Sequence, residues 1–326
     1  MNRSMPSRRT LLTAAGTGMA ATLAGCLGGG DDSENGDDAT DDSENGDDAT
    51  DDSENGDDAT DDSENGDDAT DEFPDDDEIV SEFSLAGDGG EVYRDWVLPT
   101  ESGDDSGVFV CEYLDFETAA TAGVETYESI RNETAEILET PPENIAGELV
   151  VPIPAGGGTA LIHFGEFEPE TVIEAIRGNE QTVIGEHRGY SVLGMSSEEG
   201  DTPTAAVGSD AVLETFLAID HIDAVAGETQ SLAAVDDDAA LLFSLLPAGV
   251  RTGIRYHPAL DDVAMSGEVR TAYEGETHTE SIRAFVFEDA ADASVERVAD
   301  LIDESADEIR TEEHHGRVVM VEYTRQ

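Results

Sequence analysis

The sequence predicts an α+β fold, with helices packed on one face of a mostly antiparallel sheet, and two observations lead to this prediction. From about residue 75, short segments rich in β-branched and aromatic residues alternate with segments whose apolar residues recur at helical spacing. Two segments, residues 159–195 and 281–323, also give the order strand, helix, strand, turn and strand, and the strand pair at 262–273 and 277–288 is joined by the turn-like Glu274-Gly275-Glu276. Layers of this kind are typical of α+β domains.

The individual elements follow from local composition. Strands are predicted at residues 108–116, 147–153, 159–167, 181–187, 190–195, 204–207, 251–256, 262–273 and 277–288. Helices are predicted at residues 118–138, 170–177, 210–219, 237–246 and 294–309. Ser209 and Asp236 stand at the start of two of these helices, where their side chains are suited to capping free backbone N–H groups.

Two segments share the same order of elements. Residues 159–195 and residues 281–323 both give strand, helix, strand, turn and strand, with Glu186-His187-Arg188-Gly189 and Glu313-His314-His315-Gly316 at the matching turns. The pattern suggests duplicated strand–helix–strand–strand units, and the sequence leaves open whether the duplication is genuine. Because residues 75–326 form a long stretch for one layer, two sub-domains are an alternative, with a break near Gly200 or near residue 248.

The N-terminus carries an export pattern. Arg8 and Arg9 precede a short, weakly apolar run that ends in Leu23-Ala24-Gly25-Cys26. This order resembles the twin-arginine signal and lipobox of bacterial and archaeal lipoproteins. The resemblance implies that residues 1–25 are a signal peptide, that Cys26 carries a lipid, and that the protein is anchored on the extracellular face of the cell membrane. The alternative is an uncleaved anchor helix, which gives the same location.

Residues 31–70 are four identical copies of DDSENGDDAT. The repeat has almost no apolar content, so it cannot bury enough surface to offset its ordering entropy. We therefore expect residues 26–74 to form a disordered acidic linker behind the lipidated cysteine. Calcium binding is an alternative, but the spacing does not match the EF-hand loop.

The charge is extremely acidic. The 326 residues include 78 acidic and 15 basic residues, every basic residue is Arg, and after residue 78 there remain 52 acids and 12 arginines. Such a domain repels itself unless salt screens the charge. A lysine-free acidic composition is similar to that of proteins from halophilic archaea. The same charge excludes nucleic acid as an expected partner, since no basic segment is present.

The common catalytic and metal-binding motifs are missing from the sequence. It has no HExxH, CxxC or Gly-x-Ser-x-Gly motif, so we predict no catalytic residues and no cofactor. His187 and His314 are weak metal-ligand candidates if the two turns meet, but ordinary hairpin turns explain them better. His163 is expected to be a half-exposed sheet residue, and Cys111 a buried, inert thiol. Asn132-Glu133-Thr134 is a candidate glycosylation sequon.

The sequence favours a binding function over catalysis. Residues 207–249 resemble a segment of bacterial and haloarchaeal surface proteins of unknown function, which implies no particular activity. Our first hypothesis is a non-catalytic surface lipoprotein that binds a cell-surface protein or small solute, or is an envelope component. The alternatives are a tethered solute-binding protein of a transporter and an extracellular hydrolase with an unfamiliar site.

Overall fold

A computed structural model describes residues 76–99, 109–153, 158–178, 181–197, 200–257, 262–274, 278–302 and 306–325. All of these residues belong to one compact unit, Phe73–Gln326. No helix among them is long and apolar enough to cross a membrane.

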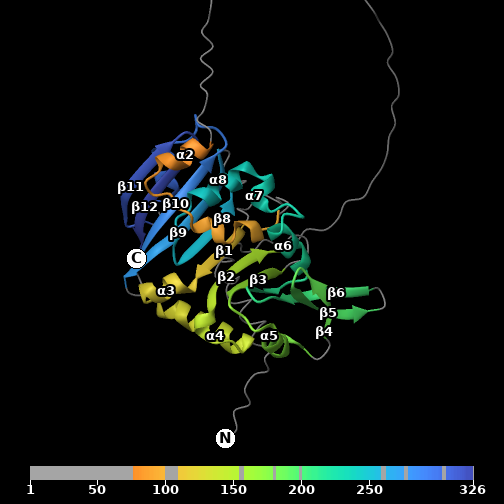
Figure 1. The fold of residues 1–326 in the computed structure, drawn as a ribbon. Helices are drawn as coiled ribbons and strands as arrows, with labels where there is room; N and C mark the ends of the chain where they lie inside the picture. Colours follow the sequence, from red (N-terminus) through yellow and green to blue (C-terminus); the bar gives the residue numbers. More distant parts are fainter. Residues whose placement is uncertain are drawn as a thin grey trace, which may run out of the picture. The chain divides into compact units, whose positions relative to one another are not determined.

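The described strands form one sheet of twelve, and every neighbouring pair is antiparallel (Figure 1). The order across the sheet is β11-β12-β10-β9-β8-β1-β2-β3-β7-β6-β5-β4. The strands are β1 (Phe109–Asp115), β2 (Ile145–Pro152), β3 (Thr159–Gly165), β4 (Thr182–His187), β5 (Tyr190–Ser197), β6 (Gly200–Val207), β7 (Ala211–Glu214), β8 (Arg251–Tyr256), β9 (Val263–Glu274), β10 (His278–Phe287), β11 (Glu308–His315) and β12 (Val318–Arg325). The predicted α+β class with a mostly antiparallel sheet is confirmed.

Helices cover both faces of this sheet, so the prediction of helices on one face is wrong. They are α2 (Asp76–Glu82), α3 (Phe116–Ala122), α4 (Glu125–Leu138), α5 (Pro169–Ile176), α6 (Ala218–Val225), α7 (Leu232–Val235), α8 (Asp237–Leu245) and α9 (Val295–Ile302), with 3-10 turns η1 (Gly89–Val92), η2 (Arg94–Trp96) and η3 (Pro142–Asn144). The first face packs against α2, η1, η2 and α6–α8 in one large apolar core. Figure 1 shows α6–α8 and α3–α5 on opposite sides of the strands.

The second face carries two separate cores. One lies under α3, α4 and α5 and includes Phe116, Leu138 and Val172. The other lies under α9 and includes Val298 and Ile302. The strands between these two cores, β1, β8 and β9, carry charged residues on the second face instead, and this difference positions the site described below.

Local signals explain several boundaries. The predicted helix 118–138 is divided into α3 and α4 at Gly123, whose φ of 70° closes α3 with a left-handed cap. Asp236 caps α8 as predicted, because its Oδ1 accepts a hydrogen bond from the N–H of Ala239 at 2.9 Å.

Two predicted helices are corrected by the structure. The helix predicted at 210–219 is wrong, because Ala211–Glu214 is β7 and α6 begins at Ala218. β7 lies between β3 and β6 and is buried on both faces, so it gives a continuous apolar run that resembles a short helix. The predicted helix 294–309 is too long, since α9 ends at Ile302 and β11 begins at Glu308.

The pairing does not confirm the proposed duplication. Both segments contain strand, helix and hairpin, as β3-α5-β4-β5 and β10-α9-β11-β12. However, β12 pairs directly with β10, whereas β6 and β7 separate β5 from β3. Of the suggested sub-domain boundaries, Gly200 begins β6 inside the sheet, and residues 247–249 connect α8 to β8.

Candidate functional site

The export and lipidation residues Arg8, Arg9 and Cys26 lie outside the described residues, as does the acidic repeat. Asn132 is on α4 and its side chain is exposed. Thr134 of the same sequon is 7% exposed and packs toward the core. The acceptor is therefore accessible, whereas the hydroxyl that completes the sequon is not.

The two candidate metal ligands do not meet. His187 ends β4 and His314 is on β11, and these two strands are the opposite edges of the sheet. His314 interacts with the backbone carbonyl of Gly316, 3.1 Å away. Among the described residues no group of three His, Cys, Asp or Glu side chains is arranged to hold a metal ion.

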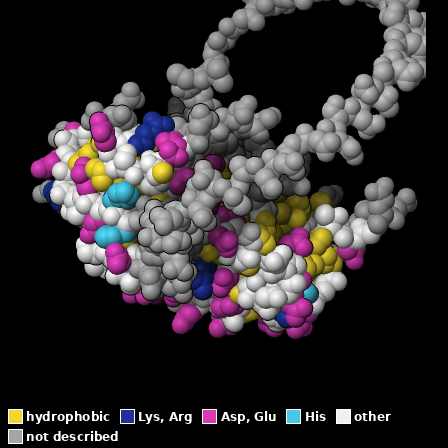
Figure 2. All heavy atoms as spheres, turned by 90° about the horizontal axis from the view of Figure 1, so that it is seen from above, with side chains coloured by type: hydrophobic (Ala, Val, Ile, Leu, Met, Phe, Trp, Pro, Cys, Tyr) yellow, Lys and Arg dark blue, Asp and Glu magenta, His cyan; other side chains and the backbone are white. Residues whose placement is uncertain are grey.

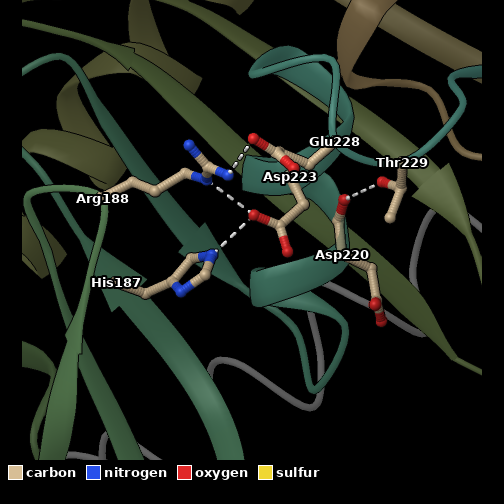
Figure 3. Close-up of polar contacts among 6 residues, drawn as sticks. All are labelled: His187, Arg188, Asp220, Asp223, Glu228 and Thr229. Carbon is tan, nitrogen blue, oxygen red and sulfur yellow. Dashed lines mark hydrogen bonds and ion pairs between the residues drawn. The ribbon is translucent and has the colours of Figure 1, made fainter.

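His187 belongs instead to a polar clamp between the β4–β5 hairpin and α6 (Figure 3). Its Nε2 lies 2.7 Å from Oδ1 of Asp223, and the same oxygen accepts a hydrogen bond from Arg188 Nε at 2.8 Å. Arg188 also forms an ion pair with Glu228 at 3.0 Å. Asp223 Oδ1 contacts both an imidazole and a guanidinium, so the His187–Asp223 pair fixes the β4–β5 hairpin to α6.

The hairpin geometry supports this structural role. Arg188 and Gly189 both have positive φ, 49° and 87°, as a two-residue hairpin turn requires. A non-glycine residue is strained at a positive φ, and the ion pairs of Arg188 offset this conformational cost. The interpretation of His187 as a hairpin residue is therefore favoured over a proton-handling role.

His163 differs from the expectation of a half-exposed sheet residue. It is 4% exposed and lies between two carboxylates on neighbouring strands of the second face. Its Nδ1 is 3.2 Å from Glu148 Oε2 and its Nε2 is 3.2 Å from Glu214 Oε1. Burial of the ring lowers its pKa, but the hydrogen bonds and charges of both glutamates outweigh burial and raise the pKa to about 10. His163 is therefore a buried cation at neutral pH.

The strongest concentration of positive charge lies on the second face of β8, β9, β10 and β12. Strand alternation and register place five side chains there, which we name the arginine face: Arg251, Arg255, Arg270, Arg283 and Arg325. Five of the twelve arginines after residue 78 thus share one face of four adjacent strands. By contrast, acidic side chains are spread over the surface seen in Figure 2, where arginines occur only at separate places.

Only part of this positive charge is neutralised locally. Arg251 forms an ion pair with Glu112, and Arg270 Nε lies 3.4 Å from Glu268. Among the described residues no carboxylate lies within ion-pair distance of Arg255, Arg283 or Arg325. The arginine face therefore carries more positive than negative charge, within a chain of formal net charge -63.

Two groups on this face, His257 and Arg283, have lowered pKa values. Burial, and then the nearby charges of Arg283 and Arg255, lower the pKa of His257 to about 4. Burial also lowers the pKa of Arg283; Glu268 and Tyr323 oppose this effect, and repulsion from Arg255 and Arg325 adds to it. His257 Nε2 lies 2.6 Å from Ser266 Oγ, and Arg283 donates to the same hydroxyl at 3.2 Å. The charges of Arg283 and Arg255 thus reinforce the effect of burial in keeping His257 neutral.

An apolar area adjoins the arginine face. Phe109, Val150 and Leu161, on β1, β2 and β3, are half-buried on the second face and belong to none of the three apolar cores. The Arg255 guanidinium lies over the Phe109 ring, 5.8 Å from its centroid. Between the two areas stands Gly253, where a Cβ would meet no atom within 4 Å among the described residues.

Sequence reasoning missed this site, although a signal was present. Arg251, Gly253 and Arg255 alternate in β8, as do Ser266, Glu268 and Arg270 in β9. Such alternation places a polar row on one face of adjacent strands. Cys111 meets its expectation: it is 1% exposed, and burial raises its pKa well above the usual thiol value.

The comparisons with known proteins give only distant structural resemblances. No family model matches the chain, and no curated protein does. Crystal form III of TP0453 is similar over 71% of this chain and 92% of its own, with a TM-score of 0.39 and 9% identity. Crystal form I of TP0453 covers 74% of this chain and 94% of its own, with a TM-score of 0.37 and 7% identity. Both resemblances are too distant to support an inference.

Proposed function

We propose that this protein is a lipid-anchored binding protein of the extracellular membrane face, whose globular part binds an anionic ligand on the arginine face. The order Arg8-Arg9, apolar run and Leu23-Ala24-Gly25-Cys26 supports export and lipidation. The repeat after Cys26 would hold the domain away from the membrane, because forty residues of random coil span on the order of 35–40 Å.

The observation that carries the binding function is the excess of arginine over carboxylate on β8–β10 and β12. Arginine presents a planar fork of donors suited to carboxylate and phosphate groups. Placing several of them on central strands costs desolvation free energy, which a stable apolar core would avoid. Binding of a negatively charged ligand would explain why arginine occupies these strand positions.

Two other functions were considered. A hydrolase built on His187 and His314 is disfavoured, because those residues lie on opposite edges of the sheet. A transporter-linked solute receptor usually has two lobes around a cleft, whereas the described strands form one continuous antiparallel sheet.

The test of anchoring compares the native chain with Cys26→Ser in a halophilic archaeal host. The native protein is expected in the membrane fraction, and Cys26→Ser is expected in the medium. Cys111→Ser is the matched control, since it removes the only other cysteine and should leave the protein on the membrane. Retention of Cys26→Ser in the membrane fraction would refute lipid anchoring.

A further inference from the structure

The second face of the sheet has an open position beside the arginine face. Gly253 pairs with Glu112 of β1 on one side and with Glu268 of β9 on the other, and both strand neighbours carry side chains on the same face. A Cβ at residue 253 would meet no atom within 4 Å among the described residues, and the glycine does not have a positive φ. Position 253 therefore has space for a Cβ among the described residues, and its backbone conformation does not require glycine.

Polar groups near this position have unused hydrogen-bonding capacity. Arg283 Nε and Ser281 Oγ are buried and have no hydrogen-bond partner among the described residues. Ser281 is two residues from Arg283 on the same face of β10, and it lies opposite Arg270 of β9. Tyr323 Oη, opposite Ser281 on the same face, is a third such group. Buried polar groups are normally satisfied, so these three retain capacity to bind further polar atoms.

The side toward β1 and β2 is apolar. Phe109 lies beneath the Arg255 guanidinium, and Val150 pairs with Glu112 in the row that contains Gly253. These side chains are half-buried without belonging to an apolar core. A ligand lying over Gly253 would have Glu112 and Glu268 as its strand neighbours, and these carboxylates are engaged by Arg251 and Arg270. Arg255 lies two residues along β8, opposite Phe109.

We propose that this region is a binding site for a small organic oxyanion: Arg255 and Arg283 bind its carboxylate or phosphate group, and its carbon part lies over Gly253 against Phe109 and Val150. The inference rests on the proposed binding function and names the ligand class for it. The planar guanidinium of Arg255 can bind an oxyanion at its edge while its face stays on Phe109.

Salt conditions favour an organic anion over an inorganic one. In molar salt, screening reduces attraction between exposed charges to a range of about 3 Å, while partly buried pairs are screened less. Chloride at that concentration also competes for exposed guanidinium groups. Apolar contacts are not weakened by screening, so a carbon part adjacent to the charged group supplies the selectivity that charge alone does not provide.

The experiment uses the full-length chain carrying Cys26→Ser, so that the attached lipid does not compete as a ligand. Isothermal titration calorimetry in molar salt measures binding of phenyl phosphate, benzoate, inorganic phosphate and phenol. We expect phenyl phosphate or benzoate to bind at least about tenfold more tightly than inorganic phosphate and phenol. Equal affinity for phenyl phosphate and inorganic phosphate would overturn the proposed contact of the carbon part with Phe109 and Val150. Equal affinity for phenyl phosphate and phenol would overturn the proposed binding of the oxyanion by Arg255 and Arg283.

Two variants locate the site. Gly253→Val fills the open position and should abolish binding without lowering stability, since valine suits a strand and its Cβ meets no atom within 4 Å among the described residues. Gly185→Val is the matched control: it lies in β4, also has open space for a Cβ, and should leave binding unchanged. If Gly253→Val bound phenyl phosphate like the unchanged chain, the site would be elsewhere. Gly253→Ala serves if the valine variant does not fold.

A third variant tests the head-group contact. Arg255→Gln should weaken phenyl phosphate binding by about tenfold or more, because a charge-assisted contact is lost. Arg310→Gln removes an exposed arginine on β11 and should have no effect. If none of the four probes binds while Cys26→Ser still releases the protein into the medium, the oxyanion site is wrong and the surface lipoprotein function is retained.

Discussion

Nε2 of His163 lies 3.2 Å from Oε1 of Glu214, on adjacent strands of the sheet. Glu148 approaches the other ring nitrogen at the same distance, and the imidazole is 4% exposed. The two glutamates stabilise the protonated form of His163. If the ring were neutral, two carboxylates would lie near each other without a cation between them.

This arrangement predicts a loss of stability at alkaline pH. The pKa of His163 is about 10 in the folded protein, above the ordinary value of 6.5. The folded state therefore binds more protons than the unfolded state between these two values. The stabilisation is fully present below about pH 6.5 and is lost as the pH rises through about 10. Denaturant unfolding followed across this range should show the decline.

His163→Gln is the variant that checks the origin of this decline. It should flatten the alkaline part of the pH profile and destabilise the domain by about 3–5 kcal/mol, the cost of breaking a buried charge set. His257→Gln is a suitable control, because the pKa of His257 is about 4 and the ring is neutral throughout that range. An unchanged alkaline slope in His163→Gln would exclude His163 as the titrating group.

The clamp on Asp223 predicts a local effect. Arg188 and then His187 hold the pKa of Asp223 below its ordinary value, so this contribution is present above about pH 4 and is lost as the pH falls below it. Asp223→Asn should speed hydrogen exchange of the β4–β5 amides and leave the global unfolding midpoint nearly unchanged, because these side chains are partly exposed. Asp220→Asn on the same helix is the control. Equal protection in both variants would contradict the clamp.

How much of this could be predicted from sequence depends on the range of the interaction. The strand Arg251–Tyr256 matches its prediction because alternation is local, and the Asp236 cap needs only its own helix. β7 was mistaken for a helix because only its neighbours β3 and β6 make Ala211–Glu214 a buried strand. His163 and the arginine face depend on which strands pair, and pairing across a sheet leaves no mark in one strand's own pattern.

Lowering the salt concentration should destabilise the whole domain. After residue 78 the chain has 52 acids and 12 arginines, and repulsion among exposed carboxylates grows as the Debye length rises from about 3 Å in molar salt to about 10 Å near 0.1 M. The thermal unfolding midpoint should therefore fall steadily with dilution. Sucrose is the control, because it favours burial without screening charge. An unchanged midpoint on dilution from molar salt to about 0.1 M would contradict the repulsion argument.

Gly90 tests whether the segment before β1 is part of the folded domain. η1 packs on α8, and a Cβ at Gly90 would lie 2.2 Å from the backbone oxygen of Phe243. The carbonyl of Trp96, farther along this segment, lies 2.7 Å from Nδ1 of His221 on α6. Because the obstructing atom is backbone, Gly90→Ala should cost about 1–3 kcal/mol of unfolding free energy through overpacking.

Gly185→Ala gives the matched comparison for that loss. It has open space for the added methyl group and no positive φ, so it should be neutral or stabilise by about 0.4–1 kcal/mol through the unfolded chain. Both variants are measured by urea unfolding in molar salt. If Gly90→Ala were as stable as Gly185→Ala, the segment would not be held against α8, and the folded domain would begin after residue 99 instead of near residue 75.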